Sequence, residues 1–146
     1  MAVVVPPWGG EASCTLRRGT QLMLVPDTTS CSDWEEPPFH GDTPAERRAC
    51  ASIILEGAGV HEVTLDGRLF RLDDDYRAQA PDRRATLPED NFLGAPAGTT
   101  IRFGGEAWVA FTKPLRRGSH EVVVHGTGTF EDEPYDVTGL LHIDVV

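Results

Sequence analysis

A chain of 146 residues with a formal net charge of −10 is long enough to bury its own hydrophobic core without a structural metal. The excess of carboxylates disfavours nucleic acid and membranes as partners, because phosphate backbones and anionic lipids both attract clustered basic side chains. No window contains the roughly 20 apolar residues that a transmembrane helix needs. Twelve arginines stand against a single lysine, Lys113, which is typical of GC-rich genomes such as those of actinobacteria.

The N-terminal third is predicted to contain two short strands and a long loop. Residues 3–5 and 21–25 are apolar runs closed by prolines, and the second run ends at the turn signal Pro26-Asp27. Residues 28–42 are rich in Ser, Asp, Glu and Pro and show no periodicity. They predict a loop, and loops of this length in compact proteins are often functional.

One α-helix is predicted over about residues 44–56. Thr43 and Glu46 form a capping box, in which each side chain reaches the backbone amide of the other, and Pro44 suits the first helical position. The expected buried face of this helix is a narrow apolar stripe made of Ala49, Ile53 and Ile54.

From residue 61 onward, apolar residues alternate with polar ones, as they do in half-buried strands. His61, Val63 and Leu65 share one face, and Asp66-Gly67 predicts a two-residue hairpin turn into residues 69–72. Further strands are predicted over residues 84–87, 100–103, 107–112, 121–125 and 139–145, with a connecting turn at Gly104-Gly105 and Leu141, Ile143 and Val145 facing inward.

Together these elements predict an all-β fold: an antiparallel β-sandwich or a flattened barrel with one inserted helix, forming a single domain over residues 1–146. The three cysteines fit no zinc-binding spacing. Cys31 and Cys50 flank the long loop and the helix, so we expect them to lie close enough to pair, with Cys14 left free.

Four stretches stand out along the chain: CTLRRG at residues 14–19, DYRAQAP at 75–81, LPEDNFLG at 87–94 and KPLRRGSH at 113–120. In this order they resemble a family of uncharacterised bacterial β-rich proteins that are usually exported. The resemblance covers nearly the whole chain, implies a β-rich single domain and brings no established activity. Members carry a leader and a further N-terminal segment, and this chain starts later. A cytoplasmic location is therefore expected, with export and removal of a leader as the alternative.

Two groups of polar residues are candidates for catalysis. Tyr76 and Arg77 follow three consecutive Asp residues, which cannot all face one cation and which predict a solvated charge run. An amphipathic ring and a bidentate donor at a strand end can line a cavity, although a packed Tyr and an Arg paired with a neighbouring Asp explain the same pattern. Glu89 and Asp90 can act as general acid or base if burial raises their pKa, or they can serve turn chemistry.

Five histidines are scattered along the chain without a metal-binding pair, so no metal site is expected. His125 can face a cavity or be a hydrogen-bonded residue of the sheet. Trp108 in a central strand is expected in the core, with the wall of a cavity as the alternative. Trp34 and Phe39 on the long loop, and Asn91 beside Asp90, are further candidates for binding.

Two functions remain open. The first is a cofactor-independent cyclase or isomerase that holds a hydrophobic, polyketide-like small molecule in a β-walled cavity of roughly 300 Å³ or more. Its expected catalytic residues are Tyr76, Arg77, Glu89, Asp90 and His125. The alternative is a non-catalytic ligand- or protein-binding module derived from an exported domain. No phosphate loop, dinucleotide fingerprint or nucleophile elbow is present, so no cofactor is expected. A homodimer is left open.

Overall fold

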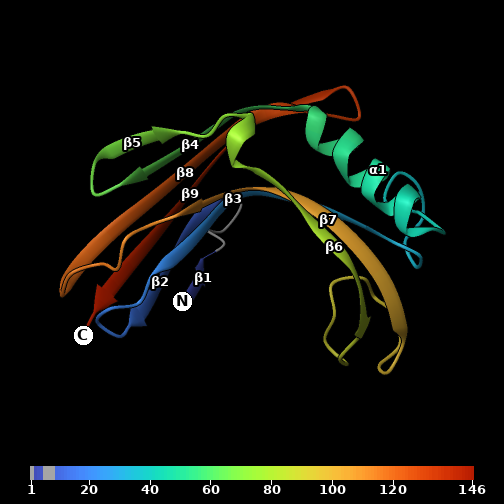
Figure 1. Cartoon of the computed structure of the whole chain (residues 1–146), viewed down its shortest axis with the longest axis horizontal. Helices are drawn as coiled ribbons and strands as arrows, with labels where there is room; N and C mark the ends of the chain where they lie inside the picture. Colours follow the sequence, from blue (N-terminus) through green and yellow to red (C-terminus); the bar gives the residue numbers. More distant parts are fainter. Residues whose placement is uncertain (1, 5–8) are drawn as a thin grey trace. The chain divides into compact units, whose positions relative to one another are not determined.

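The computed structural model describes residues 2–4 and 9–146, so Val5 and Trp8 lie outside the described residues. In this part of the chain nine strands and one α-helix form (Figure 1). In chain order they are β1 (Ala2–Val4), β2 (Gly10–Leu16), β3 (Leu22–Ser32), α1 (Pro44–Glu56), β4 (Ala58–Leu65), β5 (Arg68–Arg71), the 3-10 turn η1 (Asp74–Tyr76), β6 (Arg77–Thr86), β7 (Thr100–Phe111), β8 (Gly118–Phe130) and β9 (Glu133–Val145).

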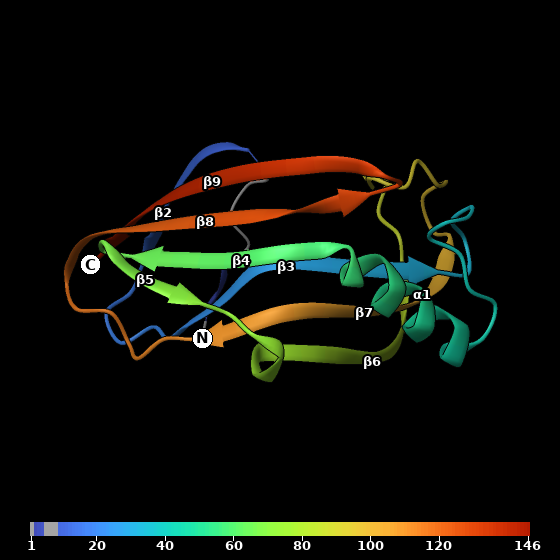
Figure 2. The same cartoon turned by 90° about the horizontal axis from the view of Figure 1, so that it is seen from above.

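The strands form a five-stranded sheet of order β2-β9-β8-β4-β5 and a four-stranded sheet of order β1-β3-β7-β6. Figure 2 shows β4, β8 and β9 of the first sheet side by side. Each sheet has two edge strands in the described part of the chain, so neither sheet closes into a barrel. The predicted all-β fold is confirmed, and of its two forms the sandwich is the correct one.

The chain divides into two compact units. The first contains residues up to Asp27, Gly57–Ala78 and Trp108–Val146, and the second contains Thr28–Glu56 and Gln79–Ala107. The sandwich belongs to the first unit, which holds all of the five-stranded sheet together with parts of β3 and β7. There His61 of β4 stacks on Trp108 of β7 with 3.7 Å between the ring centroids, so the two sheets face each other.

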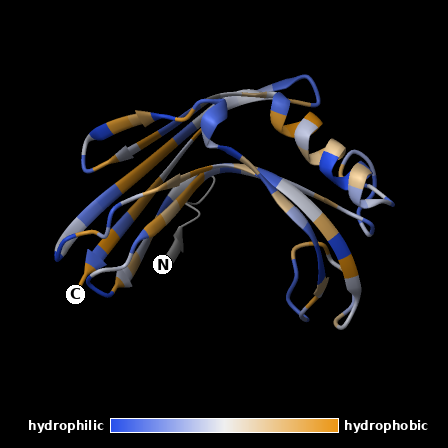
Figure 3. Cartoon of the chain, in the orientation of Figure 1, coloured by the Kyte–Doolittle hydropathy of each residue, from blue (hydrophilic) through white to orange (hydrophobic). Residues whose placement is uncertain are grey.

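Hydrophobic and hydrophilic residues alternate along the strands of the first unit (Figure 3), and the core follows from this alternation because successive side chains point to opposite faces. Leu141, Ile143 and Val145 are buried, as predicted, while His142 and Asp144 are exposed. Of the three residues predicted to share one face of β4, His61 and Val63 are buried and Leu65 is half-buried. The Asp66-Gly67 turn has the two positive φ angles, 51° and 77°, that a two-residue hairpin of this type requires.

Two strand pairs are parallel, and both involve the N-terminal strands. β1 pairs with β3, and β2 pairs with β9 from Gly10 opposite Gly139 to Leu16 opposite Val145. β4–β5, β4–β8 and β8–β9 are antiparallel. The sequence analysis predicted no strand at β2, although Ala12, Cys14 and Leu16 alternate there with the exposed Glu11, Ser13 and Thr15.

Two predicted turns are wrong because strands continue through them, and the strand predicted over residues 84–87 begins earlier, at Arg77. β3 runs through Pro26-Asp27, and the described residues of β1 pair with it at Leu22, Met23 and Leu24, before the proline. β6 contains Pro81 and extends over residues 77–86, which an edge strand tolerates. β7 passes through Gly104-Gly105. Gly105 is needed in the strand and not in a turn, because a Cβ there would come within 2.9 Å of the Thr29 carbonyl oxygen.

The helix forms where predicted, over Pro44–Glu56, with the predicted capping box: the Thr43 amide donates to Glu46 Oε2 at 2.8 Å, and the Glu46 amide donates to Thr43 Oγ1 at 3.2 Å. Its predicted buried face is wrong. Ala49 and Ile53 are exposed, and the buried residues are Arg47, Ala51 and Leu55. The guanidinium of Arg47 can be buried because the second unit supplies its partners, Asp82 and the Gly41 and Asp42 carbonyls.

The cysteine prediction is confirmed. Cys31 and Cys50 form a disulfide within the second unit, with their Cα atoms 6.2 Å apart, and Cys14 is free.

Candidate functional site

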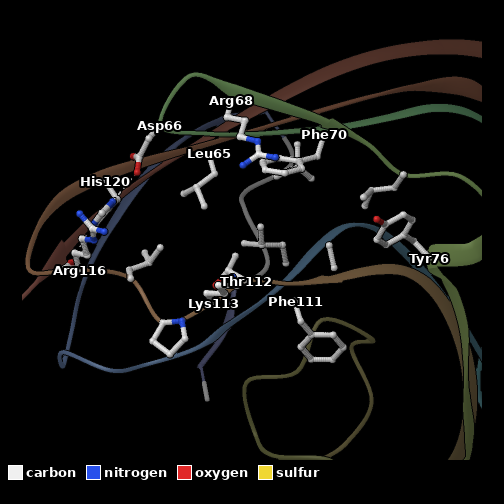
Figure 4. A pocket seen from close by; sticks show the side chains of 16 residues that line it. Leu65, Asp66, Arg68, Phe70, Tyr76, Phe111, Thr112, Lys113, Arg116 and His120 are labelled. Carbon is white, nitrogen blue, oxygen red and sulfur yellow. Dashed lines mark hydrogen bonds and ion pairs between the residues drawn. The ribbon is translucent and has the colours of Figure 1, made fainter.

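A cleft of about 540 Å³ lies in the first unit, lined by residues of the β4–β5 hairpin on one side and of the β7–β8 connection on the other (Figure 4). Leu24, Val63 and Leu72 form part of its apolar wall. The residues that give the cleft its chemical character are Asp66, Arg68, Phe70, Tyr76, Phe111, Lys113, Arg116 and His120.

The β4–β5 hairpin forms one wall of the cleft. The turn at Asp66-Gly67 reverses the chain so that Arg68 and Phe70 follow on β5, and the Leu72 amide closes the wall by donating to the His61 carbonyl at 3.0 Å. The next residues form η1, capped by Asp73, whose side chain accepts from the Asp75 amide. This capped turn carries Tyr76 to the cleft (Figure 4).

Thr112 fixes the opposite wall. Its amide donates to the Leu22 carbonyl at 3.0 Å, and its hydroxyl oxygen accepts from the Leu22 amide at 3.2 Å. The chain then crosses to β8 through Lys113 and Arg116, both of which line the cleft.

The aromatic side chains around the cleft remain accessible. Phe111 is 59% exposed, Tyr76 is 44% exposed and Phe70 is 37% exposed. In Figure 4 the Phe111 and Tyr76 rings lie toward one end of the cleft, and Arg116 and His120 lie toward the other. The cleft therefore has an aromatic end and a basic end.

At the basic end His120 and Asp66 are hydrogen-bonded. His120 Nδ1 lies 2.7 Å from Asp66 Oδ2, and Nε2 lies 2.9 Å from the Arg116 carbonyl oxygen. These two acceptors raise the pKa of His120, because both ring nitrogens must carry a proton to donate to them. Burial acts to raise the pKa of Asp66, but the hydrogen bonds from His120 and the Glu121 amide outweigh it and hold the pKa below its usual value.

A second polar cluster lies inside the sandwich. Trp108 is stacked on His61 on one side, and the Arg77 guanidinium lies 5.3 Å from the Trp108 ring. His61 Nδ1 is 3.6 Å from Asp27 Oδ2, and Tyr135 donates to the same oxygen at 3.3 Å. Among the described residues neither ring nitrogen of His61 has a hydrogen-bond partner.

The environment of this cluster shifts two pKa values. Burial lowers the pKa of His61, and the charge of Arg77 lowers it further, so the ring is neutral near pH 7. Burial, reinforced by Asp27, raises the pKa of Tyr135 to about 12.

The structure brings together only some of the residues expected to form a site. Tyr76 lines the cleft, and Arg77 contacts Trp108, which is buried as its core role predicts. His125 bonds Asp136 at 2.9 Å and lies 3.5 Å from Glu62, and these carboxylates raise its pKa. Of the two alternatives predicted for His125, this is the hydrogen-bonded residue of the sheet and not the residue facing a cavity.

The other expected residues belong to the second unit. Glu89 and Asp90 are exposed in the loop after β6, and Asn91 organises that loop through hydrogen bonds to Pro88 and Ala95. Trp34 is 46% exposed, and the Phe39 carbonyl accepts from the Ser32 amide. None of these five residues lines the cleft of the first unit.

Sequence reasoning missed most of the cleft, because residues 113–118 look like a turn and residues 69–72 like an ordinary hairpin strand. The unusual signal was Lys113, the single lysine, close to the Arg116-Arg117 doublet and to His120. Across residues 2–4 and 9–146, no three His, Cys, Asp or Glu side chains group so that they could hold a metal ion. In the same residues no helix has the length and apolar character needed to cross a membrane.

Comparison with known proteins assigns no family. No family model matches the chain, and no curated protein matches it. Among solved structures, a cysteine protease inhibitor from Entamoeba histolytica is similar over 99% of this chain and 96% of its own, with 11% sequence identity and a TM-score of 0.32. A likeness at this level carries no argument about function.

Proposed function

We propose that this protein binds a hydrophobic small molecule in the cleft of the first unit. The observation that carries the proposal is the exposure of Phe70, Tyr76 and Phe111 around one hollow. Aromatic rings left accessible in this way gain burial when a ligand enters. The volume of about 540 Å³ falls within the roughly 300–1,000 Å³ of typical small-molecule sites.

The hydrogen bonds at the cleft favour binding over catalysis. A general base must present a free nitrogen or oxygen to the substrate. His120 and Asp66 satisfy each other, and the second nitrogen of His120 is bonded to the Arg116 carbonyl. Tyr76 is the residue of the expected catalytic set that lines this cleft. Cyclase or isomerase activity stays a prediction, for which Tyr76→Phe should lower turnover with little loss of stability.

Fluorescence titration with the neutral dye N-phenyl-1-naphthylamine tests the proposal, because the emission of this dye rises in an apolar environment. Wild-type protein should bind one equivalent. Phe111→Ala should weaken binding: if the dye covers about 50 Å² of the ring, the loss is about 1.2 kcal/mol, or roughly eightfold in Kd.

The matched control is Phe92→Ala. Phe92 is 91% exposed and does not line the cleft, so its removal should leave the affinity unchanged. Equal losses in both variants would show that the dye binds exposed aromatic rings in general and would refute the cleft as the site. No binding to wild-type protein would refute the function itself.

A further inference from the structure

The charge of the cleft is opposite to that of the whole protein. Acidic residues exceed Lys and Arg by 23 to 13 in the full chain. Around the cleft the permanent cations are Arg68, Lys113 and Arg116, against one carboxylate, Asp66. A basic site on an acidic protein attracts an anion locally, since the repulsion from distant carboxylates is screened beyond about 8–10 Å at physiological salt.

Asp66 forms no ion pair with these three cations, because both of its oxygens are hydrogen-bonded to other groups. Oδ2 is bonded to His120 and Oδ1 accepts from the Glu121 amide at 3.0 Å. In the described part of the chain, none of Arg68, Lys113 and Arg116 forms an ion pair within 4 Å. Three cations in one cleft are thus available to an external acceptor.

The basic end is held in place by the fold. His120 bridges the hairpin turn, through Asp66, to the carbonyl of Arg116. This bridge restrains the backbone from which the Arg116 side chain projects. On the other wall the Arg68 guanidinium lies 4.9 Å from the centroid of the Phe70 ring, which orients its planar donor group (Figure 4).

We propose that the ligand is an amphipathic anion: a small molecule with an apolar body and one carboxylate or similar acidic group. The apolar body lies against Phe70 and Phe111, and the acidic group binds Arg116, Lys113 and Arg68. This inference rests on the proposed function and adds the chemical class of the ligand. Guanidinium groups suit it because they donate two parallel hydrogen bonds to one carboxylate.

Two dyes that differ in one charged group test the inference. 8-Anilino-1-naphthalenesulfonate carries a sulfonate on the same aromatic frame as N-phenyl-1-naphthylamine. Wild-type protein should bind the sulfonate about tenfold more tightly, since a hydrogen bond to a charged group contributes about that factor. Raising NaCl from about 0.05 M to about 0.5 M should weaken binding of the sulfonate and leave binding of the neutral dye unchanged.

The double variant Lys113→Gln/Arg116→Gln should lose the preference for the sulfonate and keep its affinity for the neutral dye. The control is Arg117→Gln, an exposed neighbour that does not line the cleft and whose loss should change neither affinity. Far-UV circular dichroism and the urea midpoint show that each variant is folded.

The outcomes separate the two proposals. Binding of the neutral dye with no preference for the sulfonate overturns the anionic ligand and leaves the hydrophobic site intact. An equal loss in Arg117→Gln also overturns it, because general surface charge would then explain the preference. Failure of both dyes to bind refutes the proposed function.

Discussion

Reduction of the Cys31–Cys50 disulfide should destabilise the protein by an amount that follows from its position in the chain. The bond joins residues 19 apart and so closes a loop of about 20 residues. In the chain-entropy model, opening such a loop releases about 11 cal/mol/K of unfolded-state entropy, or about 3 kcal/mol at 25 °C. The Cα separation of 6.2 Å is common for disulfides, so the folded backbone need not move when the bond opens.

Urea denaturation with and without a phosphine reductant measures this difference. With a denaturant slope of about 2 kcal/mol/M, the midpoint should fall by roughly 1.5 M. The slope should rise slightly, because the unfolded chain becomes less compact without its cross-link. Cys14→Ser is the control and should show the same response to reductant as wild type, since Cys14 is not bonded. A midpoint that moves by less than about 0.5 M would refute the entropic reasoning.

Two further predictions concern the basic end of the cleft and the buried arginine. The raised pKa of His120 implies that its stabilising contribution is complete below about pH 6.5 and disappears as the pH rises through the folded-state pKa. His120→Gln should therefore lose less urea resistance than wild type between about pH 5.5 and about pH 8. An NMR titration that places the pKa of His120 at the usual value for a free imidazole, about 6.5, would contradict this. Arg47→Met should lower the free energy of unfolding by about 1–3 kcal/mol, because the buried Gly41 carbonyl loses its donor. Arg48→Met, beside it on the half-buried side of the helix, should cost much less in the same urea assay; equal losses would argue against the role of the Arg47 hydrogen bonds.

Local signals in the sequence determined several parts of this protein. The capping box at Thr43 and Glu46 and the Asp66-Gly67 turn act through neighbouring backbone atoms, so they could be identified without knowledge of the fold. Alternation placed Val63 and the last strand correctly, because a strand buried on one face repeats every two residues. The single-domain prediction and the cytoplasmic location stay predictions.

Features that depend on contacts between residues far apart in the sequence could be identified only from the tertiary structure. Arg47 is buried because Asp82, 35 residues away in sequence, accepts from it, and no helical pattern shows that partner. Gly104-Gly105 lies inside β7, and only the fold shows that the Thr29 carbonyl oxygen leaves no room for a Cβ at Gly105. The cleft joins a hairpin near residue 68 to a connection near residue 115, and His120 links the two through its bonds to Asp66 and to the Arg116 carbonyl. Such sites are made of side chains that meet only after folding, and the spacing along the chain carries no record of their contact.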